Sequence, residues 1–283
     1  MSVAVVTDST AYLPAELVDA YGLTVVPLTV VLNGAEGLEG VEFFPADAAR
    51  ALREKRARVS TSRPAPEVFA RTYRRLLADG AQAVVSVHLS ADLSGTYDAA
   101  VLAAAEVGDE RVTVVDTRLI GMGVGFPAMA AAALAADGAG HEQVRQAALD
   151  AAARTEVYFY VDTLEFLRRG GRINAATALV GTALSVKPIL QLADGVIVQR
   201  DKVRTASRGV ARLADLAVTA AGTGPVDIAV HHLDAPERAE LLRTELETRL
   251  GEGLQALYVT EVGAVAAAHA GPGLASVVIH RHA

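Results

Sequence analysis

The sequence predicts an α/β protein of two domains, a parallel sheet flanked by helices followed by a mixed α+β domain. In the N-terminal half, short β-branched runs alternate with alanine- and leucine-rich stretches of helical periodicity, a pattern typical of a parallel sheet covered by helices. Beyond about residue 155 this alternation changes, and Asp194-Gly195 between two apolar runs is typical of a hairpin turn. We therefore expect an α/β domain at 1–155 and an α+β domain at 156–283.

The N-terminal strands are expected where apolar runs are short and uninterrupted, because both faces of a parallel sheet are buried. They cover residues 3–7, 24–32, 83–88 and 112–116. Helices are expected between them, three with proline near the first turn, where a missing N–H is tolerated. These helices cover residues 14–21, 45–55, 66–77, 93–106 and 126–136.

The C-terminal domain is expected to pack its strands under two long helices at 206–220 and 236–250. A shorter helix is expected to end at Gly170-Gly171, because glycine is the usual residue just past a helix C-terminus. The expected strands cover residues 156–161, 186–192, 196–199, 226–231, 256–261 and 276–280.

The composition excludes several classes of function. A net charge of -7 argues against a nucleic-acid partner, which needs a basic surface. The absence of cysteine excludes disulfides, thiolate nucleophiles and cysteine-ligated metal sites, and it fits a reducing compartment. No secretory signal is visible, so we expect a cytoplasmic protein. The uncharged stretch 119–136 is interpreted as a glycine-rich loop and a buried helix, not as a transmembrane segment.

Hydroxyl-rich clusters follow several of the expected strands. Each can cap the next helix or bind an anion, and the residues alone leave both readings open. For the third cluster, carboxylate binding is favoured over acyl transfer, because no nucleophile-elbow glycine precedes Ser94. The clusters are Thr7-Asp8-Ser9-Thr10, Ser60-Thr61-Ser62-Arg63-Pro64 and Ser90-Ala91-Asp92-Leu93-Ser94-Gly95-Thr96.

Other motifs carry weaker predictions. Gly121-Met122-Gly123-Val124-Gly125 fails the dinucleotide spacing by one residue. The arginines around Gly170-Gly171 can satisfy a helix C-terminus or contact an acidic or phosphorylated partner. His269 stands alone in an apolar helix, where a satisfied core histidine is the commoner case. The histidine pairs at 231–232 and 280–282 lack metal-ligand spacing, so no metal is expected.

In their order along nearly the whole chain, these motifs resemble the DegV family, which binds fatty acids and includes the FakB subunits of bacterial fatty acid kinase. The motifs that carry the resemblance are Thr7-Asp8-Ser9-Thr10, Thr61-Ser62-Arg63-Pro64, Leu93-Ser94-Gly95-Thr96-Tyr97, Val115-Asp116-Thr117, Asp162-Thr163-Leu164-Glu165, Arg169-Gly170-Gly171-Arg172-Ile173, Lys187-Pro188-Ile189-Leu190, Lys202-Val203-Arg204-Thr205 and His269-Ala270-Gly271-Pro272-Gly273.

The resemblance implies one long-chain fatty acid buried between the two domains, no cofactor, and no chemistry by this chain alone. It further implies that a separate ATP-dependent kinase subunit makes acyl phosphate for phospholipid metabolism, and it leaves room for transient contact with a membrane surface. The implied carboxylate-binding residues are Thr61, Ser62, Ser94, Gly95, Thr96 and His269. The implied contacts with the kinase or phosphate are Arg169, Arg172 and Arg204.

Three residues depart from the family pattern: Arg63 stands where glutamine is common, Ala270 where threonine is common, and Gly121 where serine is usual. Two other classes of function stay open. The first is a serine-dependent hydrolase or transferase of small molecules that uses Ser94 and His269. The second is a nucleotide-binding regulator that uses the glycines at 121–125.

Overall fold

The described residues of the computed structural model are 2–54, 58–108, 110–173 and 186–282, and the chain forms two compact units. Unit 1 comprises Met1–Thr29 and Ser62–Arg154, and unit 2 comprises Val30–Thr61 and Thr155–Ala283. The segment 30–61, which the sequence assigns to the N-terminal domain, thus groups with the second unit. The domain boundaries drawn from the sequence stay a prediction.

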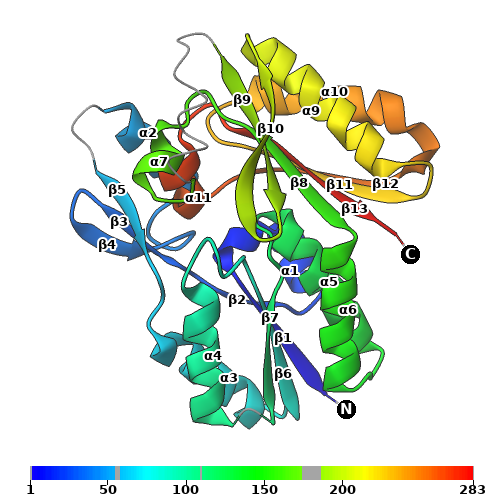
Figure 1. Cartoon of the computed structure of the whole chain (residues 1–283). Coiled ribbons are helices and arrows are strands. Elements are labelled where there is room, and N and C mark those ends of the chain that lie inside the picture. The colour runs from blue at the N-terminus through cyan, green and yellow to red at the C-terminus, as the bar shows by residue number, and fades with distance from the viewer. Residues whose placement is uncertain (1, 55–57, 109, 174–185, 283) are drawn as a thin grey trace. The chain divides into compact units, whose positions relative to one another are not determined.

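Unit 1 contains a four-stranded parallel sheet in the order β2-β1-β6-β7. Its inner strand β6 is buried along its whole length, because helices α3 and α4 pack on one face of the sheet and α5 and α6 on the other (Figure 1). This confirms the predicted parallel α/β architecture. The elements are β1 (Val3–Asp8), η1 (Ser9–Ala11), α1 (Ala15–Ala20), β2 (Thr24–Val26), α3 (Pro66–Ala78), β6 (Ala83–His88), α4 (Thr96–Val107), β7 (Val112–Asp116), α5 (Met122–Ala136) and α6 (His141–Ala153).

Two helices of unit 1 differ from the prediction. Helix α6 was not predicted, because its buried side is mostly alanine, which weakens the apolar periodicity. Helix α5 begins at Met122 with Gly121 as its N-cap, so Gly123 and Gly125, which were predicted to lie in a loop, are helical. A buried backbone must satisfy its N–H and C=O groups internally, and a helix does so. The missing side chain of Gly125 lets this helix lie close to Leu13.

Unit 2 contains a mixed six-stranded sheet in the order β10-β9-β8-β13-β11-β12, in which only β11 and β12 run parallel among the described strands. Helices α9 and α10 pack on this sheet (Figure 1). The mixed α+β prediction is confirmed. The elements are β8 (Thr155–Tyr160), α7 (Glu165–Arg169), β9 (Lys187–Ala193), β10 (Val196–Val203), α9 (Ala206–Ala221), β11 (Val226–His232), α10 (Pro236–Leu250), η2 (Gly251–Gly253), β12 (Leu254–Glu261), α11 (Ala264–Ala270) and β13 (Ala275–Arg281).

A second, smaller sheet completes unit 2, with the order β4-β3-β5. The elements of this segment are β3 (Thr29–Leu32), β4 (Ala35–Leu38), α2 (Pro45–Arg53) and β5 (Val59–Ser62). Strand β5 lies where a hydroxyl-rich loop was predicted, because the pairing partner that makes it a strand is distant in sequence. The predicted end of α2 at residue 55 lies outside the described residues.

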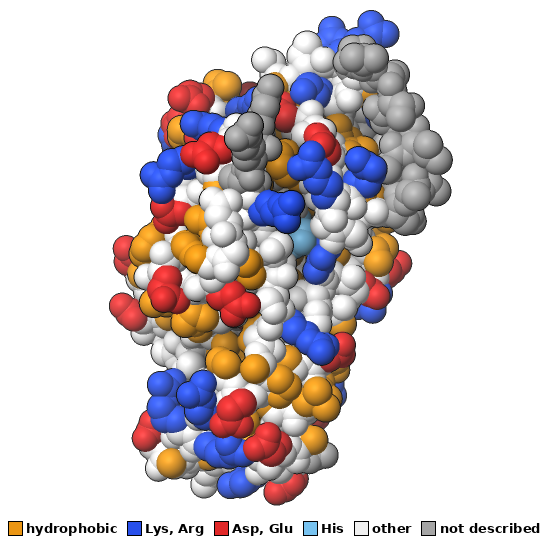
Figure 2. Space-filling model, turned by 90° about the vertical axis from the view of Figure 1, so that its left-hand side faces the viewer, with side chains coloured by type: hydrophobic (Ala, Val, Ile, Leu, Met, Phe, Trp, Pro, Cys, Tyr) orange, Lys and Arg blue, Asp and Glu red, His pale blue; other side chains and the backbone are white. Residues whose placement is uncertain are grey.

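One face of the molecule shows basic, acidic and hydrophobic side chains interspersed, without a continuous basic stripe (Figure 2). Across the described ranges, no helix is both long enough and apolar enough to cross a membrane.

Candidate functional site

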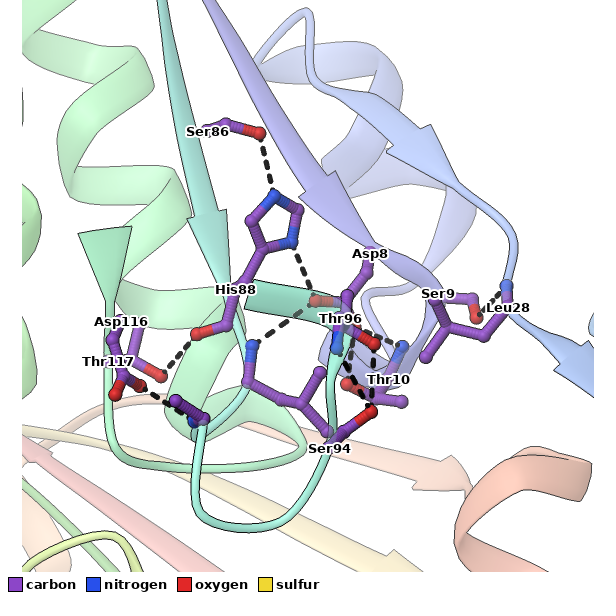
Figure 3. A network of polar contacts seen from close by, with 12 residues as sticks. Asp8, Ser9, Thr10, Leu28, Ser86, His88, Ser94, Thr96, Asp116 and Thr117 are labelled. Atoms are coloured by element: carbon purple, nitrogen blue, oxygen red, sulfur yellow. Dashed lines mark hydrogen bonds and ion pairs between the residues drawn. The ribbon is translucent and has the colours of Figure 1, made fainter. Parts of the chain in front are cut away.

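The switch point of the unit 1 sheet lies between β1 and β6. Strand β2 pairs with one side of β1 and β6 with the other, so the chain leaves these two carboxyl ends in opposite directions. Open α/β sheets bind ligands in the crevice that this divergence creates. The hydroxyl cluster at 7–10 spans the end of β1 and the cluster at 90–96 follows β6, so both lie at this edge (Figure 3).

Asp8, the last residue of β1, is fully buried and accepts hydrogen bonds from both connections. One carboxylate oxygen accepts from the backbone N–H of Thr10 at 3.0 Å and from the Thr10 hydroxyl. The other accepts from the backbone N–H of Leu89 at 3.2 Å and lies 2.9 Å from Nδ1 of His88. Asp8 therefore fastens the start of the loop that carries Ser94 (Figure 3).

A buried chain of hydrogen bonds extends from Asp8. Because a carboxylate only accepts, Nδ1 of His88 donates to Asp8, and in the neutral ring Nε2 accepts from the Ser86 hydroxyl at 2.7 Å. The Tyr73 hydroxyl donates to Ser86 at 2.9 Å. Burial raises the pKa of Tyr73 well above its ordinary value.

This Ser86–His88–Asp8 order is that of a catalytic triad, but all three side chains are fully buried. No substrate reaches a serine with zero exposure, so the arrangement is structural. This arrangement was not predicted from the sequence. The available signal was the spacing of Ser86 and His88, because residues two apart on a strand point to the same face.

The loop after β6 is held at further points. Asp116, which ends β7, accepts from the backbone N–H of Ala91 at 3.3 Å. Ser90 donates its backbone N–H to the carbonyl of Leu119 at 2.9 Å, and the Thr117 hydroxyl donates to the His88 carbonyl at 2.8 Å. A loop held by backbone contacts on both sides presents its side chains in a defined position.

Ser94, Gly95 and Thr96 form the junction between this loop and α4. The hydroxyl oxygens of Ser94 and Thr96 are 2.9 Å apart, and Ser94 also accepts from the backbone N–H of Thr96 at 3.3 Å. Gly95 is the N-cap of α4, so the hydroxyl of Ser94 lies at the positive end of a twelve-residue helix. The structure thus brings these three predicted residues together at a position suited to an anion.

Arg63 adds a positive charge to the same junction. A Cβ atom at Gly95 would lie 3.0 Å from Cδ of Arg63, so this side chain packs against the glycine. Arg63 is exposed, and it departs from the family pattern, in which glutamine is common at this position. Its proximity to Gly95 could not be read from the sequence, because 32 residues separate the two.

Within unit 2, the structure pairs Thr61 with His269. The Thr61 hydroxyl at the end of β5 lies 2.9 Å from Nε2 of His269, which α11 carries. Glu39 accepts a hydrogen bond from the backbone N–H of Val265 at 2.8 Å and so holds the first turn of α11. The pairing of residues 208 positions apart was implied by the resemblance alone.

The imidazole of His269 is neutral at pH 7. Burial of the ring, and to a smaller extent the positive charge of Arg172, lowers the pKa of His269 to about 4. Its Nδ1 is buried and has no hydrogen-bond partner among the described residues. Arg172 donates to the carbonyl oxygen of Gly170, beside the ring.

The other predicted site residues are exposed or form contacts with residues close in sequence. Ser62 is exposed and donates to the carbonyl of Arg63 at 3.3 Å. Arg169 is paired with Glu165 on α7, and Arg204 is exposed between β10 and α9. Ser94 belongs to unit 1 and His269 to unit 2, and each is hydrogen-bonded within its own unit.

Neither a metal site nor a nucleotide loop emerges in the described ranges. No group of three or more His, Asp or Glu side chains there is arranged to hold a metal ion. Gly123 and Gly125 lie inside α5, with Gly125 against Leu13, so they do not form a phosphate-binding loop.

Comparison with known sequences identifies close relatives. The matching family model is described as "Uncharacterised protein, DegV family" and covers residues 2–282. A DegV domain-containing protein of Streptomyces coelicolor is 56% identical over 277 residues, 98% of each chain. One from Mycobacterium tuberculosis is 39% identical over 280 residues, 99% of this chain and 97% of the relative.

Comparison with solved structures identifies the same group. A DegV family protein from Thermus thermophilus, described for its fatty acid binding, matches with a TM-score of 0.93 and 36% identity, covering 100% of both chains. DegV from Bacillus subtilis, described as a fatty acid binding protein, matches with a TM-score of 0.90 and 31% identity, again covering 100% of both chains.

Proposed function

The chain belongs to the DegV family, and from this we propose that it binds one long-chain fatty acid through hydroxyl donors, in the cytoplasm. The observation that carries the proposal is the Ser94–Thr96 hydroxyl pair, 2.9 Å apart at the N-terminus of α4. Two relatives of the same fold are described as fatty acid binding. The absence of cysteine fits a reducing compartment.

Hydroxyls suit a buried carboxylate because they stabilise the charge without introducing a second buried ion that needs its own partner. We propose that Ser94 and Thr61 donate to the carboxylate, with Ser62, Gly95 and Thr96 contributing to the same site and His269 supporting Thr61. The acyl chain adds about 0.8 kcal/mol per buried methylene, so the tail supplies most of the affinity.

The presence of a ligand is tested by extracting the purified protein with solvent and identifying acyl components by mass spectrometry. We expect about one fatty acid per chain, because an apolar cavity of acyl length is unfavourable when empty. Failure to find an acyl component, together with no uptake of added fatty acid, contradicts the proposal.

The head-group assignment is tested by titrating Ser94→Ala and Thr61→Ala with a fatty acid and with the alcohol of the same chain length. Each change removes one charge-assisted hydrogen bond, so acid affinity should fall roughly 10- to 100-fold while alcohol affinity changes less. Thr72→Ala in unit 1 and Thr219→Ala in unit 2 are matched controls, because each hydroxyl donates to the carbonyl one helical turn back. Unchanged acid affinity in Ser94→Ala and Thr61→Ala places the head group elsewhere.

We further propose that the bound acid is presented to a separate ATP-dependent kinase, with Arg169, Arg172 and Arg204 contacting the partner or the transferred phosphate. Three arginines suit a phosphorylated ligand: Arg169 ends α7, Arg172 follows it, and Arg204 follows β10. With that kinase, ATP and fatty acid, acyl phosphate should form, and Arg204→Ala should slow it without weakening acid binding. Arg71→Ala, an exposed change on α3, is the control. Formation of acyl phosphate without any kinase contradicts the proposal that this chain only binds the acid and a separate kinase phosphorylates it.

The hydrolase reading rests on Ser94 and His269. Incubation with acyl esters distinguishes hydrolysis from binding. Sustained turnover by wild type that disappears in both Ser94→Ala and His269→Ala would establish catalysis. We expect no turnover. The low basicity of His269, whose pKa is lowered to about 4, makes it a weak general base.

A further inference from the structure

The backbone conformation of Gly170 does not require glycine. Gly170 ends α7 with φ −73° and ψ −11°, an ordinary right-handed conformation that every L-residue adopts. Alanine at such a position is normally favoured over glycine, since it restricts the unfolded chain and has the higher helix propensity. The preference for glycine must come from what lies beside it.

The neighbour is the imidazole ring of His269. A Cβ atom at residue 170 would lie 2.9 Å from Cε1 of His269 and closer still to Nδ1, separations below 3.0 Å that real Cβ atoms essentially never show. The ring therefore occupies the volume that any side chain at residue 170 would need. Arg172 donates a hydrogen bond to the carbonyl oxygen of Gly170.

The position of the ring determines how its single proton is used. Nδ1 is buried without a partner among the described residues, whereas Nε2 lies 2.9 Å from the Thr61 hydroxyl. A proton on Nδ1 would leave a buried N–H unpaired, which is rarer in proteins than an unpaired acceptor. The favoured tautomer carries the proton on Nε2 and donates it to Thr61. The hydrogen of the Thr61 hydroxyl is then free to be donated to another group.

We propose that Gly170 is a positioning residue of the carboxylate site. Because it has no side chain, the His269 ring fits beside it with Nε2–H donating to Thr61. The Thr61 hydroxyl then donates its own hydrogen to the ligand. This inference rests on the proposed fatty acid site. It assigns Gly170 a part in head-group selection, because a hydroxyl committed as a donor prefers a carboxylate, which only accepts, over a neutral head group.

The first test reads the ring in the ligand-free protein. Long-range ¹H–¹⁵N spectra report which imidazole nitrogen of His269 carries the proton. We expect protonation at Nε2 in wild type and a changed ring signal in Gly170→Ala. Gly224→Ala is the matched control, because Gly224 is exposed, belongs to the same unit and has nothing within 4 Å of its Cβ position. A ring protonated at Nδ1 in wild type, or a signal that Gly170→Ala leaves unchanged, overturns the inference.

The second test is a double-mutant cycle on affinity for a fatty acid and its alcohol. Gly170→Ala should weaken acid binding by about as much as His269→Ala, on the order of 10-fold, with a smaller effect on the alcohol. In the His269→Ala background the ring is gone, so Gly170→Ala should have no further effect. An equal loss in that background means that Gly170 acts through the fold and not through His269. Thermal melting of every variant identifies loss of folding.

The two tests separate failure of this inference from failure of the proposed function. If wild type takes up no fatty acid, the proposed function fails, and the ring signal of the ligand-free protein still decides whether Gly170 seats His269. If the acid binds and His269→Ala weakens it, but Gly170→Ala does not, the proposed function stands and Gly170 has no part in it.

Discussion

At the scale of single residues, Asp8 is the acceptor of several buried hydrogen bonds. Its two carboxylate oxygens accept from Thr10, Leu89 and His88, and all are buried. Asp8→Asn replaces one acceptor by a donor, so at least one buried N–H is left facing another donor. We expect the free energy of unfolding to fall by about 2–4 kcal/mol, measured by urea denaturation. Asp79→Asn, an exposed change at the end of α3, should have little effect, and an equal loss in both variants would contradict this role of Asp8.

His231 predicts a pH dependence of stability. Burial, followed by the neighbouring charge of His232, lowers the pKa of His231 to about 4, against about 6.5 in an unfolded chain. Between these pH values the unfolded chain binds a proton that the folded protein does not. The contribution is therefore complete above about pH 6.5 and is lost as the pH falls towards 4, with an upper limit on the order of 3 kcal/mol.

The measurement is urea unfolding of wild type and His231→Gln at several pH values from 7 to 4.5. Glutamine can keep a hydrogen bond to Thr260, which lies 2.7 Å from Nδ1 of His231, without a titrating ring. The variant should lose less stability on acidification than wild type. His141→Gln at the start of α6 is the control. Parallel pH profiles for wild type and His231→Gln would show that another group dominates.

At the scale of secondary-structure elements, the packing of α9 on β8 depends on Gly209. A Cβ atom there would lie 2.5 Å from Cδ2 of the Tyr160 ring. Alanine would gain about 1 kcal/mol in helix propensity, but overpacking a buried contact typically costs about 1–3 kcal/mol. We expect Gly209→Ala to be destabilising on balance, measured by urea denaturation. Ser207→Ala, an exposed change on the same helix, should be neutral or stabilising; a stabilising Gly209→Ala would mean that the ring adapts without cost.

Elements differ in how well the sequence predicts them. The bounds of β1, β6 and β7 were predicted within one or two residues, since strands buried on both faces consist mainly of apolar residues. Helix α6 was missed because its buried Ala148 and Ala151 cannot be told from its less buried alanines in the sequence. Strand β5 was missed because a strand exists only through its partner, and its polar residues have no strand pattern of their own.

At the scale of the whole molecule, the segment Val30–Thr61 is part of unit 2. Helix α2 packs against α11, Glu39 accepts from Val265, and Arg53 is paired with Asp234. A fragment of residues 155–283 therefore lacks the segment that packs on α11. We expect its α11 amides to exchange with solvent faster than in the full chain, while those of the inner strand β13 stay protected, measured by hydrogen exchange. A fragment with 30–61 joined by a flexible linker should restore protection, and equal exchange of α11 in all three proteins would show that unit 2 does not need this segment.

The sequence by itself determined the alternation of strands and helices, the two-part architecture and the family, because these follow from local periodicity and from motifs in a fixed order. It also indicated which loops carry hydroxyls. Only the tertiary structure decided which distant residues meet: Thr61 with His269, Arg63 with Gly95, Gly170 with the imidazole ring, and His88 with Asp8. The physical reason is that a hydrogen bond or a close contact depends on positions in space set by the packing of whole elements, whereas periodicity depends only on neighbours along the chain.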